Sequence, residues 1–292
     1  MQLFGAFHYE FMQRAVVAGC FIAVLCSTLG VFLVLRRLSL IGDGLAHVTF
    51  GSVAVGLLLR TEPTYTAIPL VMLSSLGILR LVEKARVYGD AAIGIVSSLG
   101  VAGGITLVSL SGGFNVDLFS FLFGSILSVS GAEVITSVVL SVAVILMVFL
   151  FYDELVSITF DEECARVSGI KTQRINTILV LLTALTVVLA MKVVGVMLVS
   201  AMLILPASAA LQVAKSFRMG MVVAAMISVF SVVFGIWISF LADLPAGGTI
   251  VLTNFTIFML ILGYRAKVPS KAKLLEPSQG VESKLLDGRE LP

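Results

Sequence analysis

Long stretches without a single Asp, Glu, Lys or Arg are the feature that most constrains how this chain can fold. They cover residues 15–35, 44–59, 63–79, 91–116, 134–152, 175–191, 193–214, 219–242 and 244–264. A membrane-spanning helix needs about 20 predominantly apolar residues, and most of these stretches reach that length once their polar ends are included. The strands of a membrane barrel would be only about ten residues long and would alternate polar with apolar side chains. The sequence therefore predicts an all-α polytopic membrane protein with eight to nine transmembrane helices.

The scarcity of charge supports this prediction and excludes two classes of protein. Only 12% of the 292 residues are charged and 59% are apolar, whereas a soluble domain carries about 25% charged residues. The net charge of +2 offers no basic surface for a polyanion. We therefore expect membrane lipid around this chain and no nucleic acid, and we exclude a soluble enzyme.

The distribution of Lys and Arg predicts the orientation of the helices, because short cytoplasmic loops are enriched in these residues. Basic residues follow every second apolar stretch, at 36–37, 80–86, 166–174, 215–218 and 265–273. The alternate loops are poor in them. This pattern predicts nine spans, with the N-terminus outside and the C-terminus in the cytoplasm. Eight spans remain possible, because only Lys192 separates two of the stretches and a re-entrant segment there would change the count.

The membrane-spanning part of the chain extends over residues 1–265, and residues 266–292 form a tail rich in Pro, Ser, Lys and Glu. We expect this tail to be flexible and cytoplasmic. Residues 118–129 are apolar but short, which predicts an interfacial or half-inserted segment. Pro206 and the Leu-Pro-Ala-Gly-Gly run at 244–248 predict kinked or broken helices, which membranes tolerate where they line a cavity or lie buried in protein.

Residues 153–174 are the longest charged segment between the apolar stretches and are too polar to span a membrane. Residues 161–167 are typical of a short amphipathic helix that breaks at Ser168-Gly169. Its charges stand where the helix dipole favours them: Asp161, Glu162 and Glu163 at the start and Arg166 near the end. We therefore predict a structured cytoplasmic segment here instead of a plain linker.

Two ionisable residues, Asp43 and His47, fall within the second expected span. Counted from Arg37 at the cytoplasmic edge, Asp43 would lie about 9 Å and His47 about 15 Å along the helix axis, the latter close to the midplane of a core about 30 Å thick. Residues four apart share a helix face. Gly51 continues that face and leaves room beside the pair. Ionisable groups at this depth are costly and by default mark an ion or substrate pathway.

The chemistry of this pair suits a metal ion. Carboxylate and imidazole together bind borderline divalent metals such as zinc, manganese or iron(II). Two ligands are too few for a site, and a second copy of the subunit across a twofold axis would supply two more. The alternative is structural: Asp43 and His47 could pair with each other and hold the bundle together.

Four motifs occur in order along the chain: Ile41 to Gly56 (IGDGLAHVTFGSVAVG), Ala92 to Ile95 (AIGI), Val194 to Ala207 (VGVMLVSAMLILPA) and Asp243 to Thr249 (DLPAGGT). This combination resembles the permease subunits of bacterial ABC importers for zinc and manganese. The resemblance extends over residues 10–265. The combination is specific, although no single motif would be.

The resemblance implies a helical fold of the vitamin B12-importer type in the bacterial inner membrane, with residues 1–265 as the permease domain. It implies three kinds of partner: a second permease subunit (a copy or a sister protein), cytoplasmic ATPases and an extracytoplasmic metal-binding protein. Asp43 and His47 match the pore metal contacts of the family. Residues 153–169 match its coupling helix, and the candidate ATPase-coupling residues within them are Asp161, Glu162, Glu163, Arg166 and Gly169.

No catalytic residue and no permanently bound cofactor are expected. The chain contains no G-x-x-x-x-G-K-[ST] phosphate loop, so ATP must be hydrolysed on another subunit. An intramembrane metalloenzyme is disfavoured, because the chain has only two histidines and no H-E-x-x-H motif. An ion-coupled transporter or gated channel for divalent cations, working without an ATPase, remains the alternative.

The resemblance favours zinc as the transported metal over manganese or iron. The sequence Gly-Asp-Gly-Leu-Ala-His from Gly42 to His47 is similar to that of zinc-uptake members. Thr49-Phe50-Gly51 departs from the Leu-Pro-Gly that many relatives carry, especially those associated with manganese. Affinity ranks zinc above manganese in most nitrogen and oxygen sites, so the pore ligands alone do not set the selectivity.

Overall fold

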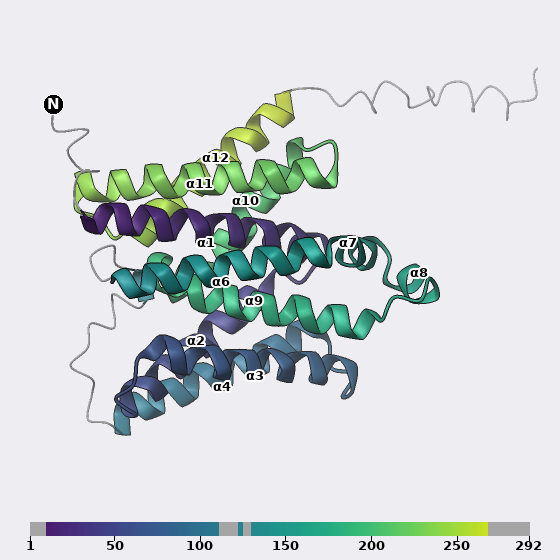
Figure 1. Ribbon diagram of the computed structural model, residues 1–292, viewed down its shortest axis with the longest axis horizontal. Helices are drawn as coiled ribbons and strands as arrows, with labels where there is room; N and C mark the ends of the chain where they lie inside the picture. Colours follow the sequence, from purple (N-terminus) through teal and green to yellow (C-terminus); the bar gives the residue numbers. More distant parts are fainter. Residues whose placement is uncertain (1–9, 111–121, 125–129, 268–292) are drawn as a thin grey trace, which may run out of the picture.

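The computed structural model describes residues 10–110, 122–124 and 130–267. All regular elements in this part of the chain are helical. They are α1 (Glu10–Leu35), α2 (Leu40–Leu58), α3 (Pro63–Glu83), α4 (Gly89–Leu110), α6 (Gly131–Leu150), α7 (Tyr152–Phe160), α8 (Glu162–Val167), α9 (Thr172–Val194), the 3₁₀ turn η2 (Val196–Leu198), α10 (Val199–Val213), α11 (Phe217–Ala242) and α12 (Ala246–Lys267). Figure 1 shows them as a bundle of long helices with α8 projecting at one end.

Nine helical segments of the described residues are long and apolar enough to cross a membrane. They include η2 and α10 together (Val196–Val213), so the structure favours nine spans over eight. The prediction of an all-α polytopic membrane protein is confirmed. The predicted tail, residues 266–292, lies outside the described residues except for its first two.

Helices α1 and α9 form the centre of the bundle. Both are largely buried, and α1 packs against α6, α9, α10 and α11. Its large side chains Ile22, Leu29 and Phe32 are completely buried. The peripheral helices α3, α4 and α6 leave most of their apolar surface exposed in the single chain. A helix that is apolar on all sides suits both positions, because lipid and a protein core are equally apolar environments.

Glycines let α2 and α4 lie in direct backbone contact. A Cβ atom on Gly51 would meet the carbonyl oxygen of Gly100, and a Cβ atom on Gly100 would lie 2.7 Å from Cα of Val48. One turn further along α4, Gly104 faces the ring of Phe50. The expectation that Gly51 leaves room beside Asp43 and His47 is therefore wrong, because the backbone of α4 fills that space.

The structure separates the sixth and seventh spans, a break that the sequence leaves open. Helix α9 ends at Val194, and its C-cap, Gly195, has a φ of 89° in the region that favours glycine. The predicted break before α12 is confirmed, with Asp243 in the left-handed region at φ 52°. Pro206, in contrast, lies inside an uninterrupted α10.

These breaks meet at one end of the bundle. A Cβ atom on Gly195 would contact the backbone of residues 122–124, and one on Gly247 would contact the carbonyl oxygens of Val194 and Phe123. Only residues 122–124 of the segment expected to be interfacial or half-inserted, 118–129, are described. They are seated against the two glycines.

The loops with basic residues gather at the opposite end. The turn after α1, the end of α3, the start of α4 and the start of α9 line one cavity there. The α10–α11 connection joins them, since the ring centroids of Phe32 and Phe217 lie 5.0 Å apart. Figure 1 shows α7 and α8 at this same end. We call it the basic end of the bundle.

Candidate metal pathway and coupling segment

Asp43 and His47 lie on the exposed strip of α2. The side chain of Asp43 is 52% exposed and that of His47 is 31% exposed, and Nε2 of His47 lies 3.7 Å from Oδ2 of Asp43. Leu40 and Phe50 extend the strip at helical spacing, while the other faces of α2 are buried against α3, α4, α9 and α10. The structure therefore brings the two predicted ligands together and leaves them open on the surface of the single chain.

The pair lies closer to the basic end than the sequence predicted. Residues 36–39 form a turn, with Arg37 at φ 57°, and α2 begins only at Leu40. At 1.5 Å per residue, Asp43 lies about 4.5 Å and His47 about 10.5 Å along α2. Asp43 thus falls in the first turn, where the helix dipole stabilises a carboxylate.

The described part of the chain holds no group of three or more His, Cys, Asp or Glu side chains that could bind a metal ion. Asp43 and His47 are therefore half of a site at most, because zinc sites take about four ligands. Their chemistry, one carboxylate and one imidazole, suits zinc, manganese or iron(II). An open strip with an incomplete ligand set can be completed by a second protein surface.

Helix α4, the neighbour of α2, carries an exposed face of small residues. Gly94, Ser98 and Ala102 follow one another at four-residue spacing and line a shallow groove of about 620 Å³ with Ile95 and Leu99. A Cβ atom on Gly94 would meet nothing within 4 Å. Such faces let membrane helices from another subunit approach closely.

The predicted amphipathic helix is confirmed as α8, with Asp161 as its N-cap. The carboxylate of Asp161 accepts hydrogen bonds from the N–H groups of Glu163 (3.0 Å) and Cys164 (2.9 Å). The bond from Cys164 lowers the pKa of Asp161 below its ordinary value. The helix ends at Val167, with Ser168 as its C-cap and Gly169 after it at φ 90°. Local capping therefore fixes both ends of α8.

The sequence did not predict α7 (Tyr152–Phe160), which separates α6 from α8. Its buried residues Leu155 and Ile158 stand three apart, and this spacing is the signal that could have revealed it. The five candidate coupling residues do not share one environment. Four of them are exposed: Asp161, Glu163, Arg166 and Gly169. Glu162 instead faces the bundle.

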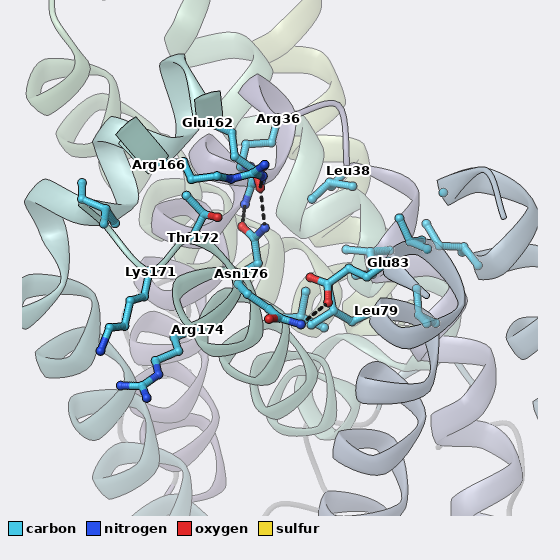
Figure 2. Close-up of a pocket in the computed structure, with 18 residues that line it drawn as sticks. Arg36, Leu38, Leu79, Glu83, Glu162, Arg166, Lys171, Thr172, Arg174 and Asn176 are labelled. Carbon is cyan, nitrogen blue, oxygen red and sulfur yellow. Dashed lines mark hydrogen bonds and ion pairs between the residues drawn. The ribbon is translucent and has the colours of Figure 1, made fainter. Parts of the chain in front are cut away.

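Glu162 belongs to a closed polar ring that the sequence did not reveal (Figure 2). The guanidinium of Arg36 donates to Oε2 of Glu162 (2.9 Å) and to Oδ1 of Asn176 (2.6 Å). The amide of Asn176 donates to Oε1 of Glu162 (3.1 Å). The side chain of Arg36 is only 11% exposed. Burial lowers the pKa of Arg36, and the Glu162 carboxylate opposes this shift.

A cavity of about 740 Å³ opens beside this ring at the basic end. Apolar residues of α2, α3 and α4 line one side, and the first turns of α9 line the other. On α9, Gln173 donates a hydrogen bond to Glu83 of α3 across 2.8 Å (Figure 2). Ile41 faces this cavity, whereas Asp43, two residues further on, lies on another face of α2.

Comparison with known families gives a match over most of the chain. The model of the "ABC 3 transport family" matches residues 8–265. A manganese transport system membrane protein, MntC of Halalkalibacterium halodurans, is 32% identical over 281 residues, which is 96% of this chain and 92% of the relative. A high-affinity zinc uptake system membrane protein, ZnuB of Haemophilus influenzae, is 29% identical over 260 residues, or 89% of this chain and 100% of the relative.

Solved structures agree with the fold. PsaBC from Streptococcus pneumoniae, in complex with Fab, superposes with a TM-score of 0.81 at 29% identity, covering 89% of this chain and 94% of the other. A metal-chelate type ABC transporter in an inward-facing conformation superposes with a TM-score of 0.65 at 16% identity, covering 87% and 86%. The second similarity bears on the fold alone.

Proposed function

The chain belongs to the ABC 3 transport family, and from this membership we propose that it is the permease subunit of an ATP-binding-cassette importer for a divalent metal ion in the bacterial inner membrane. Relatives named for manganese and for zinc match it at similar identity. Zinc and manganese are therefore the two candidate cargoes, and the sequence from Gly42 to His47 favours zinc. The permease domain comprises residues 1–265, with the N-terminus outside and the tail 266–292 in the cytoplasm.

The observation that carries this proposal is the open Asp43–His47 strip on a membrane-spanning helix. Ionisable side chains in a span avoid lipid and face protein or a water-filled pathway. A second permease subunit placed against α2 and the small-residue face of α4 would cover the strip. Across a twofold axis it would add a second carboxylate and a second imidazole, which gives the four ligands of a divalent metal site.

The exposed face of α8 supports an ATPase partner. Asp161, Glu163, Arg166 and Gly169 are accessible at the basic end, which is the cytoplasmic end under the positive-inside rule. We propose that this face docks into a cytoplasmic ATPase, and that an extracytoplasmic metal-binding protein delivers the ion to the opposite end. An ion-coupled transporter or gated channel is the competing function, and it would move metal without the ATPase.

Reconstitution in proteoliposomes tests the proposal. The permease with its ATPase should accumulate zinc or manganese only when ATP is present, and the permease alone should not. Parallel uptake of each ion, at equal free concentration and with the binding protein present, identifies the cargo. Metal accumulation by the permease alone would establish the channel or ion-coupled transporter instead.

A further inference from the structure

The ring of Arg36, Glu162 and Asn176 joins three elements that are distant in sequence. Arg36 lies in the turn after α1, Glu162 on α8 and Asn176 on α9. Glu162 and Asn176 lie 126 and 140 positions from Arg36 in the sequence. Each pair in the ring shares one hydrogen bond, and the carboxylate of Glu162 uses both oxygens. Displacing α8 would therefore pull directly on the turn between α1 and α2.

The turn that holds Arg36 is tied to α1 by backbone hydrogen bonds and leads directly into α2. The N–H of Arg36 donates to the carbonyl oxygen of Phe32, and that of Leu38 donates to the carbonyl oxygen of Leu33. The N–H of Ile41, already in α2, donates back to Leu38. Asp43 follows within the same first turn of α2. A displacement of Arg36 is thus transmitted to the candidate metal ligand through continuous hydrogen-bonded backbone.

The cavity beside the ring gives the elements room to move. It lies between the start of α9 and the apolar walls of α2, α3 and α4, and the hydrogen bond from Gln173 to Glu83 links α9 to α3 beside it. Interiors without such space resist displacement, because their side chains are close-packed. Polar side-chain bonds next to open space can instead exchange partners at low cost.

We propose that Arg36 is a positioning residue for transport: it couples the movement of α8 on the ATPase to the Asp43–His47 strip of α2. The inference rests on the proposed function and adds a specific route from ATP to the metal ligands. Arg36 is suited to this role because a guanidinium presents several donors in fixed geometry and holds two partners at once.

Arg166 does not serve this role. Its guanidinium lies 3.6 Å from the same Glu162 carboxylate, but it is 66% exposed and belongs to α8 itself. A pair within one helix cannot transmit displacement to another element. Arg14 offers a matched control, because its pair with Glu10 is exposed and lies within α1.

The experiment measures metal transported per ATP hydrolysed in proteoliposomes that contain permease and ATPase. In Arg36→Gln, assembly with the ATPase and basal ATP hydrolysis should stay at the wild-type level, while the transport ratio falls at least about fivefold, the lower end of typical coupling between sites. Arg14→Gln should keep the wild-type ratio. The exchange Arg36→Glu with Glu162→Arg should restore it, because the Asn176 amide both donates and accepts.

A second variant keeps the test valid if the protein with the exchanged pair does not fold. Arg36→Lys keeps the charge but loses the bidentate geometry, so its ratio should lie between those of wild type and Arg36→Gln. Equal losses of uptake and ATP hydrolysis in Arg36→Gln, or an unchanged ratio, would overturn the inference while leaving the proposed function intact. Absence of ATP-dependent uptake by the wild type would overturn the proposed function, and this inference with it.

Discussion

The Oδ2 atom of Asp43 and the Nε2 atom of His47 lie 3.7 Å apart, one turn from each other on α2. This separation is too long for a hydrogen bond. Two ligands of a tetrahedral zinc ion, at bond lengths of about 2.1 Å, lie roughly 3.4 Å apart, so a small side-chain adjustment would bring this pair to that distance. The separation is therefore compatible with two ligands of one metal ion, which is the role proposed for the pair.

The glycine contacts between α2 and α4 should control the stability of the strip. Gly100→Ala would push a methyl group against Cα of Val48, and overpacking of this kind costs about 1–3 kcal/mol. We expect a lower midpoint of thermal unfolding in detergent and weaker metal uptake. Gly103→Ala, on the same helix but with nothing within 4 Å of the new atom, is the matched control. Equal unfolding midpoints for the two variants would contradict the close α2–α4 contact.

The N-cap of α8 should be needed for recovery of the ATPase. Asp161→Ala removes the acceptor for the N–H groups of Glu163 and Cys164, so less ATPase should co-purify with the permease. Asp161→Asn keeps a capping oxygen and should retain most of it. If Asp161→Ala and wild type recover the same amount of ATPase, α8 is not the docking element.

The same cap has a defined pH dependence. The pKa of Asp161 is lowered in the folded protein, so its carboxylate stabilises α8 fully at any pH above its unfolded pKa. That contribution is lost only as the pH falls through the lowered folded pKa. ATPase recovery should therefore be insensitive to Asp161 titration across the neutral range. If ATPase recovery instead changed with pH near neutrality, and this pH dependence disappeared in Asp161→Asn, the assignment would be contradicted.

Membrane orientation can be checked with reporters. A reporter fused after Lys273 should be active in the cytoplasm, and one inserted near Asn115 should be external, because the basic loops mark the inner side. Reporters on the same side of the membrane would contradict nine spans with this orientation.

Local signals explain what the sequence predicted well. The uncharged stretches locate the spans, and the acids of residues 161–163 and Gly169 locate α8. Each of these depends on neighbouring residues alone. The family resemblance added the fold type, and the family match confirms the resemblance.

Long-range packing explains what the sequence did not predict. The start of α2 depends on the left-handed Arg37 in the preceding turn, so Asp43 lies shallower than a count from that residue implied. Gly51 packs against the backbone of Gly100, nearly fifty positions further along the chain. The basic residue Arg36 was interpreted as a topology marker, yet it is buried in the ring with Glu162 and Asn176. None of these contacts has a signature in the local sequence.

The central claim is that Asp43 and His47 bind the transported metal instead of merely holding the bundle together. The most direct measurement is ATP-dependent metal uptake by the double variant Asp43→Leu with His47→Leu, alongside its assembly with the ATPase. Replacing both members of a pair by apolar residues is often neutral for folding, so we predict a folded, assembled transporter that moves no metal. A folded double variant with uptake at the wild-type level would contradict the claim.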